Sequence, residues 1–256
     1  MSVQTVDRAI AVLDILNASE RELSLTEVSH KLGLHKSTVH RLLASLEKGG
    51  LVDRPPGSRK YRLGIRLIEL GNTVLNTRKL PQTILPYLHY LSDTVEEIAY
   101  LAVRDEKEVL NLLQVPSPHL LESVLWTGRA PLHCTSTGKV FLAHMSEDEL
   151  KTLLKNGLPR MTEKTITDPA ELRRELEQVR EQGFATAFGE HQEHINAIAV
   201  PIINSNNELI AAIGVVGPSH RFTPEKVMSS PNIIQGVARE ASRQLASLPS
   251  KVLKMT

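Results

Sequence analysis

Gly33 separates two short amphipathic patterns, and this arrangement restricts the fold of the N-terminal region more than any other feature of the sequence. Ser24 begins the first pattern, whose apolar residues recur at helical spacing: Leu25, Val28 and Leu32. Glycine tolerates a positive φ, so the chain can turn sharply directly after this helix. The second pattern is capped by Ser37 or the residue before it, ends at residues 49–50, and has an apolar face of Val39, Leu42, Leu43 and Leu46. The sequence therefore predicts a helix, a tight turn and a second helix.

Two short extended runs follow, residues 51–54 and 59–63, with Pro55-Pro56-Gly57-Ser58 between them. These four residues favour a reversal of the chain, so we predict a β-hairpin. An earlier amphipathic pattern at residues 5–16 predicts a further helix, with Thr5 as its N-cap. A helix-turn-helix followed by a hairpin is a winged helix-turn-helix, which places its second helix in the major groove of DNA.

Positive charge supports this interpretation, because residues 31–62 carry a net charge of +6 in a chain whose total is +1. The predicted DNA contacts are the polar side of the second helix and the hairpin: Lys36, Ser37, Thr38, His40, Arg41, Ser45, Arg54, Arg59, Lys60 and Tyr61. Hydroxyls and the helix N-terminus can bind phosphates, and Arg41 is long enough for a bidentate contact to guanine. The alternatives are a winged helix used only for protein contact, and His40 as an ordinary surface residue.

The remaining sequence predicts a linker helix and a larger α+β domain. Helical patterns cover residues 65–80, a segment ending near Thr94, and residues 137–144, 147–154, 169–182 and 233–248. Strand patterns cover residues 98–103, 109–115, 184–188, 195–203 and 209–216, and the prolines between 116 and 131 indicate a loop. Strands at both ends of a helical middle favour one sheet covered by helices. We therefore expect domains at 1–64 and 81–256, joined by a linker at 65–80.

Composition excludes several classes of protein. Hydrophobic residues make up 41% of the 256 positions, and no apolar run approaches the roughly 20 residues that span a bilayer, so we expect a cytoplasmic globular protein without a membrane partner. One cysteine, Cys134, excludes a disulfide framework and a Cys-rich zinc finger. His133 and Cys134 are adjacent and would point to opposite faces of a strand, so we expect no catalysis. The segment from Glu190 to His194 is either a polar loop or a metal site.

Several stretches in order along the chain resemble the IclR family of bacterial transcriptional regulators. They are SVQTVDRA at 2–9, LHKSTVHRLL at 34–43, YRLG at 61–64, LHCTSTGK at 132–139, GFA at 183–185, Glu190, and AAIGVVGP at 211–218. The resemblance implies a winged-helix DNA-binding domain, a linker helix and a GAF-like effector-binding domain. It also implies a homodimer or homotetramer that binds operators of catabolic or metabolic operons, without a cofactor and more often as a repressor.

The segment Ser136-Thr137-Gly138 is the candidate effector site, because it opens a predicted helix. Free N–H groups at a helix start, together with the positive end of the helix dipole, bind anions such as a carboxylate. In the alternative, these residues only cap their helix.

The resemblance implies that the effector lies between this helix start and the late strands, where this chain has the apolar residues Ala197, Gly214 and Val216. We therefore expect a mid-sized carboxylate, either aromatic or aliphatic, with Trp126 or Phe188 beside it and Glu190 at the family's acidic position. The alternatives are Trp126 as core packing, and a domain that only oligomerises or binds a metal.

Overall fold

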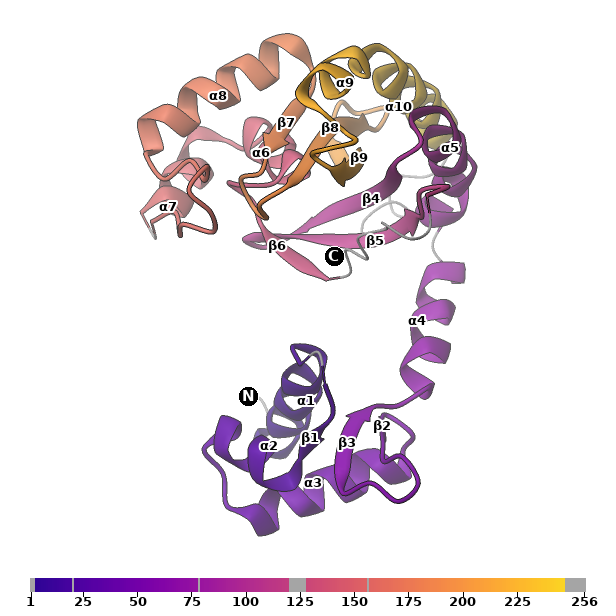
Figure 1. The fold of residues 1–256 in the computed structure, drawn as a ribbon, viewed down its shortest axis with the longest axis vertical. Coiled ribbons are helices and arrows are strands. Elements are labelled where there is room, and N and C mark those ends of the chain that lie inside the picture. Colours follow the sequence, from indigo (N-terminus) through magenta and orange to yellow (C-terminus); the bar gives the residue numbers. More distant parts are fainter. Residues whose placement is uncertain (1–2, 20, 78, 120–127, 156, 247–256) are drawn as a thin grey trace. The chain divides into compact units, whose positions relative to one another are not determined.

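The computed structural model describes residues 3–19, 21–77, 79–119, 128–155 and 157–246 (Figure 1). The chain divides into two compact units, residues 1–77 and 78–256, and each is described by itself. No helix within the described ranges is long and apolar enough to cross a membrane.

The N-terminal unit has the predicted helix-turn-helix and hairpin. Its elements are α1 (Gln4–Asn17), β1 (Leu23–Ser24), α2 (Leu25–Leu32), α3 (Lys36–Lys48), β2 (Val52–Asp53), β3 (Lys60–Leu63) and α4 (Arg66–Thr77). The strands form an antiparallel sheet in the order β1-β3-β2. The sequence did not predict β1, because two residues carry no periodicity.

Local interactions explain where these helices begin and end. The Ser24 hydroxyl accepts a hydrogen bond from the Glu27 N–H while the Glu27 carboxylate accepts one from the Ser24 N–H, which forms a capping box at the start of α2. Gly33 ends α2 with φ 63°, as the tight turn requires. Two predicted caps are wrong. Thr5 lies inside α1, which begins without a side-chain cap, and α3 is capped by the His35 ring, which accepts from the Ser37 N–H.

The four predicted inward residues of α3 are buried together with residues of the other elements. This core contains Val12, Leu16, Leu23, Val28, Val39, Leu42, Leu43, Leu46, Val52 and Tyr61. Because α3 uses one side for this core, its opposite side is left for other contacts.

The C-terminal unit is α+β, as predicted. Its elements are α5 (Lys79–Val95), β4 (Ile98–Asp105), β5 (Glu108–Val115), β6 (Arg129–Pro131), α6 (Ser136–Ala143), α7 (Glu147–Leu154), α8 (Pro169–Gln182), β7 (Ala185–Phe188), β8 (Ile195–Ile203), β9 (Leu209–Pro218), α9 (Pro224–Ser229) and α10 (Pro231–Ala246). All strands pair antiparallel in one sheet, in the order β6-β5-β4-β9-β8-β7.

Three details of this unit differ from the prediction. Pro131 ends strand β6 and does not lie in a loop, which is possible because β6 is an edge strand. The six-residue helix α9 was not predicted. Helix α5 already begins at Lys79, so Pro81 lies in its first turn and Pro86 lies inside it.

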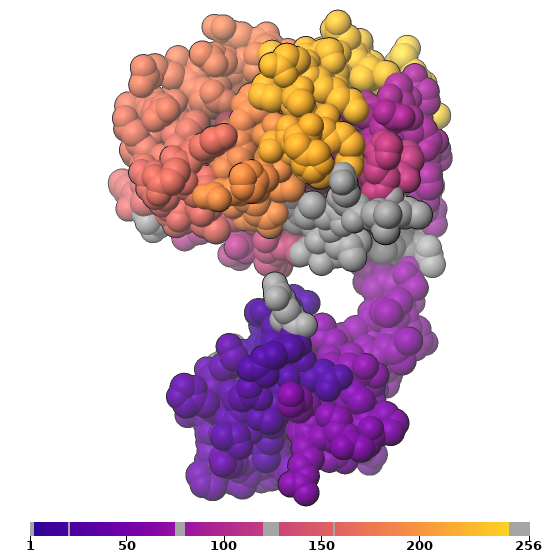
Figure 2. Space-filling view, in the orientation of Figure 1, coloured from indigo at the N-terminus to yellow at the C-terminus, as the bar shows by residue number. Residues whose placement is uncertain are grey.

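Helices cover both faces of the sheet, and Figure 2 shows α8, α9, α10 and α5 forming much of the surface on the side in view. Helices α5 and α10 pack on one face, over a large apolar core that includes Leu101, Ile198 and Ile213. Helix α6 lies on the other face, with α8 packed against it, and their core includes Val140, Leu176 and Ala212. The start of α6 therefore lies inside the unit, against the sheet.

Candidate functional sites

Helix α3 presents a polar surface on the side opposite its core. Lys36, Ser37, His40, Arg41 and Ser45 are exposed, and Thr38 is half-buried. The Ser37 hydroxyl lies 2.8 Å from His35 Nδ1, so the first turn of the helix is held by its own side chains. The structure thus brings the predicted α3 residues together on one accessible face.

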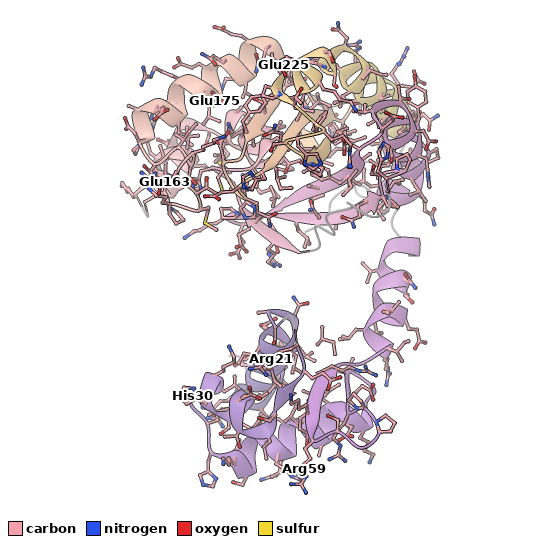
Figure 3. All side chains as sticks on the ribbon, viewed as in Figure 1. Arg21, His30, Arg59, Glu163, Glu175 and Glu225 are labelled. Carbon is pink, nitrogen blue, oxygen red and sulfur yellow. The ribbon has the colours of Figure 1, made fainter. Side chains whose placement is uncertain are left out.

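The hairpin places further cations beside α3, and the two lie along the same side of the unit in Figure 1. Arg54 and Lys60 are exposed, and Arg59 extends away from the unit at the hairpin turn (Figure 3). Arg54 is partly neutralised, because it lies 3.6 Å from Glu47. Within residues 3–19 and 21–77, by contrast, Lys36, Arg41, Arg59 and Lys60 form no ion pair with a side chain. These four charges are available to a polyanion.

Tyr61 was predicted to contact DNA, and the structure contradicts this prediction. Its side chain is 5% exposed and belongs to the core of the unit, because it points inward from β3 where the neighbouring Lys60 and Arg62 point outward. The Arg54 guanidinium lies 5.9 Å from the centre of its ring. Tyr61 packs in the core beneath the hairpin and does not belong to the exposed face of the hairpin.

The start of α6 is buried in the C-terminal unit. Ser136, Thr137 and Gly138 are its first three residues, and all three are buried. The exposed fraction is 0% for Ser136 and 1% for Thr137. The cap is Thr135, whose hydroxyl accepts from the Gly138 N–H at 3.1 Å, so capping is not the role of Ser136 or Thr137. A Cβ at position 138 would lie 2.1 Å from the Leu132 carbonyl oxygen, and only glycine fits this close approach.

The sheet faces this helix start with small and apolar residues. The register places Val216 of β9 between Ile98 of β4 and Ala197 of β8, and these three form one apolar cluster with Tyr100 and Ala102. Gly214, two residues before Val216, is the partner of Tyr100. The predicted residues Ala197, Gly214 and Val216 are therefore on the same face as the start of α6.

Tyr100 connects the sheet with the start of α6, and the sequence did not indicate this role. Its hydroxyl lies 3.1 Å from the Ser136 hydroxyl, although the residues are 36 positions apart. A tyrosine within an apolar strand resembles any other core residue in a sequence. Only the pairing of β4 with β9 shows that its ring crosses Gly214 toward α6.

Two further predicted effector residues do not join the site. Phe188 packs against the core on the α5 and α10 side of the sheet, because side chains alternate along β7 and its neighbour Ala187 takes the other face. Phe188 was predicted to lie beside the effector, but the residue of β7 that faces α6 is its neighbour Ala187. Trp126 lies outside the described residues.

Glu190 is buried beside α6 and binds Lys139. The Lys139 ammonium donates to Glu190 Oε1 at 2.8 Å and to Glu175 Oε1 of α8 at 2.9 Å. The Lys139 side chain is 1% exposed and that of Glu190 is 8% exposed. Burial raises the pKa of Glu190 above its usual range, and the Lys139 charge opposes that shift. The second oxygen, Oε2, is buried, and no residue in the described part of the chain forms a hydrogen bond with it.

The loop after β7 and the residues before α6 give no metal centre or nucleophile. Among the residues that the structure describes, no group of three or more His, Cys, Asp or Glu side chains could hold a metal ion. Cys134 is fully buried, and burial, more than the nearby Glu190 carboxylate, raises the pKa of its thiol to about 12. The His133 ring is bonded to the Pro159 carbonyl oxygen, and burial lowers its pKa. A thiol that stays protonated at neutral pH is a poor nucleophile and a poor ligand.

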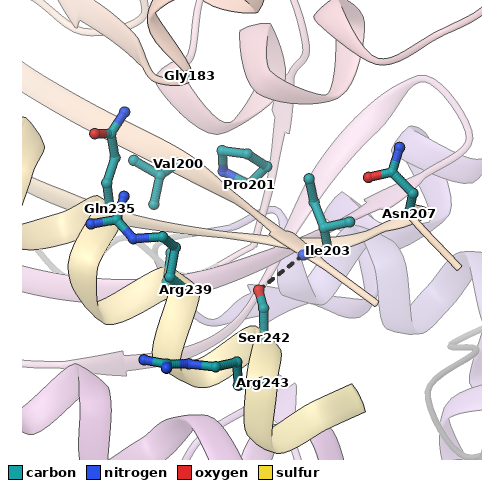
Figure 4. Close-up of a pocket in the computed structure, with 10 residues that line it drawn as sticks. Gly183, Val200, Pro201, Ile203, Asn207, Gln235, Arg239, Ser242 and Arg243 are labelled. Carbon is teal, nitrogen blue, oxygen red and sulfur yellow. Dashed lines mark hydrogen bonds between the residues drawn. The ribbon is translucent and has the colours of Figure 1, made fainter. Parts of the chain in front are cut away.

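An open groove of about 650 Å³ lies between β8 and α10 (Figure 4). Its floor includes Val200 and Pro201, and Arg239 and Arg243 of α10 lie along its rim. The Ser242 hydroxyl accepts from the Ile203 N–H at 3.2 Å, which satisfies a donor at the end of β8. This groove shares no residue with the site at the start of α6.

The arrangement of a helix-turn-helix unit and an α+β unit agrees with comparisons to known proteins. The IclR helix-turn-helix domain matches residues 5–56, and the bacterial transcriptional regulator IclR C-terminal domain matches residues 72–243. The chain belongs to the IclR family. The regulators of this family control transcription through DNA.

Two relatives of this IclR-family regulator come from Escherichia coli strain K12. The HTH-type transcriptional regulator KdgR is 33% identical over 95% of this chain and 93% of KdgR. The transcriptional repressor IclR is 30% identical over 94% of this chain and 89% of the length of that repressor. An IclR homologue from Microbacterium hydrocarbonoxydans, solved as a complex with 4-hydroxybenzoate, has a TM-score of 0.81 and 29% identity, covering 95% of this chain and 100% of that one.

Proposed function

We propose that this IclR-family protein is a sequence-specific repressor of a catabolic or metabolic operon that binds its operator through α3 and the β2–β3 hairpin. The observation that carries this proposal is a set of cations on one side of the N-terminal unit that form no ion pair within its described residues, Lys36 and Arg41 on α3 with Arg59 and Lys60 on the hairpin. Cations without a protein partner supply the sequence-independent attraction to phosphates, and Arg41 can in addition recognise guanine. Because its operator would be chromosomal, we place its action in the cytoplasm.

Operator binding in this family of folds needs paired recognition helices, and we propose that the chain acts as a homodimer or a dimer of dimers. Large apolar side chains are exposed on α4 and just before it, with Ile65 at 82%, Ile68 at 61% and Val74 at 49%. A helix with apolar residues on several sides is usually buried against a partner. A second copy of α4 would cover them. Ile68→Glu should then shift the sedimentation coefficient toward that of the monomer, and an unchanged value would contradict this role of α4.

We further propose that the effector is a mid-sized carboxylate, aromatic or aliphatic, bound between the start of α6 and the β4, β9 and β8 strands. Support comes from the first turn of α6, which is buried against an apolar face of the sheet, so that an anion-binding helix start lies beside residues that would contact a hydrophobic body. The Microbacterium homologue, which was solved with 4-hydroxybenzoate, shows that a protein of similar fold binds such an acid.

The test is binding of the purified protein to the promoters of its own gene and of the neighbouring operon. Mobility shifts at two salt concentrations, with and without a panel of carboxylates, should show specific complexes that weaken with salt and that one class of acid dissociates. Specific binding that no acid alters, together with a melting temperature that no acid raises, would support a domain that only assembles the protein. A failure to bind either promoter would contradict the regulator.

A further inference from the structure

The ring of Tyr100 lies across the sheet at Gly214. A Cβ at position 214 would lie 2.8 Å from both Cζ and the hydroxyl oxygen of Tyr100, so the phenol end rests directly on this glycine. The hydroxyl therefore stands above β9, on the side of the sheet that α6 covers. The absence of a side chain at 214 is what lets a residue of β4 reach the helix.

Three hydroxyl groups meet at the start of α6. Tyr100 forms hydrogen bonds with the hydroxyls of Ser136 and Thr137, and all three residues are at most 4% exposed. Burial raises the pKa of Tyr100 above its usual value, so the phenol keeps its proton at neutral pH. A hydroxyl can redirect its proton by rotation without moving its oxygen. Tyr100 and Ser136 can thus exchange their mutual bond for two bonds donated to the same acceptor.

A second observation shows that polar groups around this turn are not all paired. Glu190 is buried, and its Oε2 atom has no hydrogen-bond partner among the described residues, while its Oε1 atom binds Lys139 of α6. A buried carboxylate oxygen without a donor is uncommon in a folded protein and needs an explanation, such as a hydroxyl on the body of a ligand, since the acid group of a ligand is ionised and has no hydrogen to donate. Hydroxyl donors therefore lie at the start of α6, and the carboxylate that binds Lys139 of the same helix has one unmatched acceptor oxygen.

We infer that Tyr100 is a specificity-determining residue of the effector site, whose hydroxyl donates, with that of Ser136, to the acid group of the effector. This inference rests on the proposed function, since it concerns the same site. The two hydroxyl donors and the positive end of α6 favour a charged carboxylate over its neutral amide. The ring at the same time fills the space above Gly214, so the body of the ligand lies toward Ile98, Ala197 and Val216.

The experiment compares one acid with its own amide. Calorimetry on the wild-type chain first finds the tightest acid in a panel of aromatic and aliphatic carboxylates that begins with 4-hydroxybenzoate, and then measures the corresponding amide. Tyr100→Phe keeps the ring and removes the donor, so the preference for the acid should fall by about tenfold, the effect of one hydrogen bond to a charged group. Ser136→Ala should lower the same ratio. Tyr90→Phe, on the exposed surface of α5, is the matched control and should leave the ratio unchanged.

The acid-to-amide ratio separates this role from a purely structural one, which would lower the melting temperature and weaken both ligands equally. An unchanged ratio in Tyr100→Phe would overturn the role of Tyr100 while the effector proposal stands. If Tyr100→Phe does not fold, the ratio in Ser136→Ala decides in the same way. Failure of the wild-type chain to bind any acid of the panel would overturn the effector proposal, and the role of Tyr100 with it.

Discussion

Lys139 forms a buried ion pair whose loss should destabilise the C-terminal unit with little change in the shape of the side chain. Lys139→Met keeps a long side chain in the α6 position and removes the charge that faces Glu190 at 2.8 Å and Glu175 at 2.9 Å. Glu190 then stays buried, and of the described residues only Phe188 still donates to its carboxylate, through its N–H at 3.4 Å. Breaking a buried ion pair in this way typically costs about 3–5 kcal/mol, because an uncompensated charge remains.

The pH dependence of this loss follows from Glu190. Burial raises its pKa in the folded protein, so the native state favours the protonated form, and this contribution is present below the unfolded value and lost as the pH rises through the folded value. Removing Lys139 removes the interaction that opposes this shift. The cost of Lys139→Met should therefore be larger at pH 7 than at pH 5, because a lower pH favours protonation of the Glu190 carboxylate that the variant leaves uncompensated.

Urea unfolding followed by circular dichroism at both pH values measures the effect. Adding Glu190→Gln to Lys139→Met should recover much of the lost stability, since it neutralises the remaining buried charge. Lys151→Met is the matched control, because that side chain is 57% exposed and lies 4.0 Å from Glu147, a type of pair that contributes about 0–1 kcal/mol. A Lys139→Met variant as stable as the wild type at pH 7, or a cost that is the same at pH 5, would refute the reasoning.

Three other substitutions or reactions test particular contacts. Gly214→Ala should lower the unfolding free energy by about 1–3 kcal/mol, because its Cβ would meet the Tyr100 ring at 2.8 Å; a variant with wild-type stability would show that the ring moves freely. The Cys134 thiol, with its pKa raised to about 12, should react with a thiol reagent at pH 8 only on unfolding, and rapid modification of the native protein would contradict its burial. Ser24→Ala should cost about 1 kcal/mol in thermal unfolding of the N-terminal unit. The Arg21 hydrogen bond lowers the pKa of Glu27 to about 2, so the contribution of this capping box should be complete above about pH 4.5 and disappear as the pH falls toward 2.

Local signals in the sequence were sufficient for the longer elements. The helices at 147–154 and 169–182 have the predicted bounds, because Ser146 and Asp168 cap them and the capping residues are visible in the sequence. Strand β8 also has its predicted bounds. By contrast, β1 and β6 have two and three residues, too few to show a period. The His35 cap was missed because histidine is not among the usual capping residues.

The candidate ligand site was predicted only in part, because it depends on contacts between distant residues. Ser136 follows from a helix start, which is a local feature. The bond from Tyr100 to Ser136 and the bond from Lys139 to Glu190 join residues 36 and 51 positions apart, and no local pattern reports them. Phe188 was placed on the wrong face because a strand's two faces differ by a single position, and the four residues of β7, ATAF, show no polar–apolar alternation that assigns the faces.

Recognition of an operator by α3 is tested most directly by the affinity of Arg41→Ala for promoter DNA. Fluorescence anisotropy with the promoter and a scrambled duplex should show a loss of about 1–3 kcal/mol for the promoter, or roughly tenfold to more than a hundredfold, and a smaller loss for the scrambled duplex. Arg21→Ala removes an equal charge from a side chain that pairs with Glu27, and it should bind the promoter nearly as well as the wild type. Equal promoter affinity for Arg41→Ala and the wild type would contradict the assignment of α3 as the recognition helix.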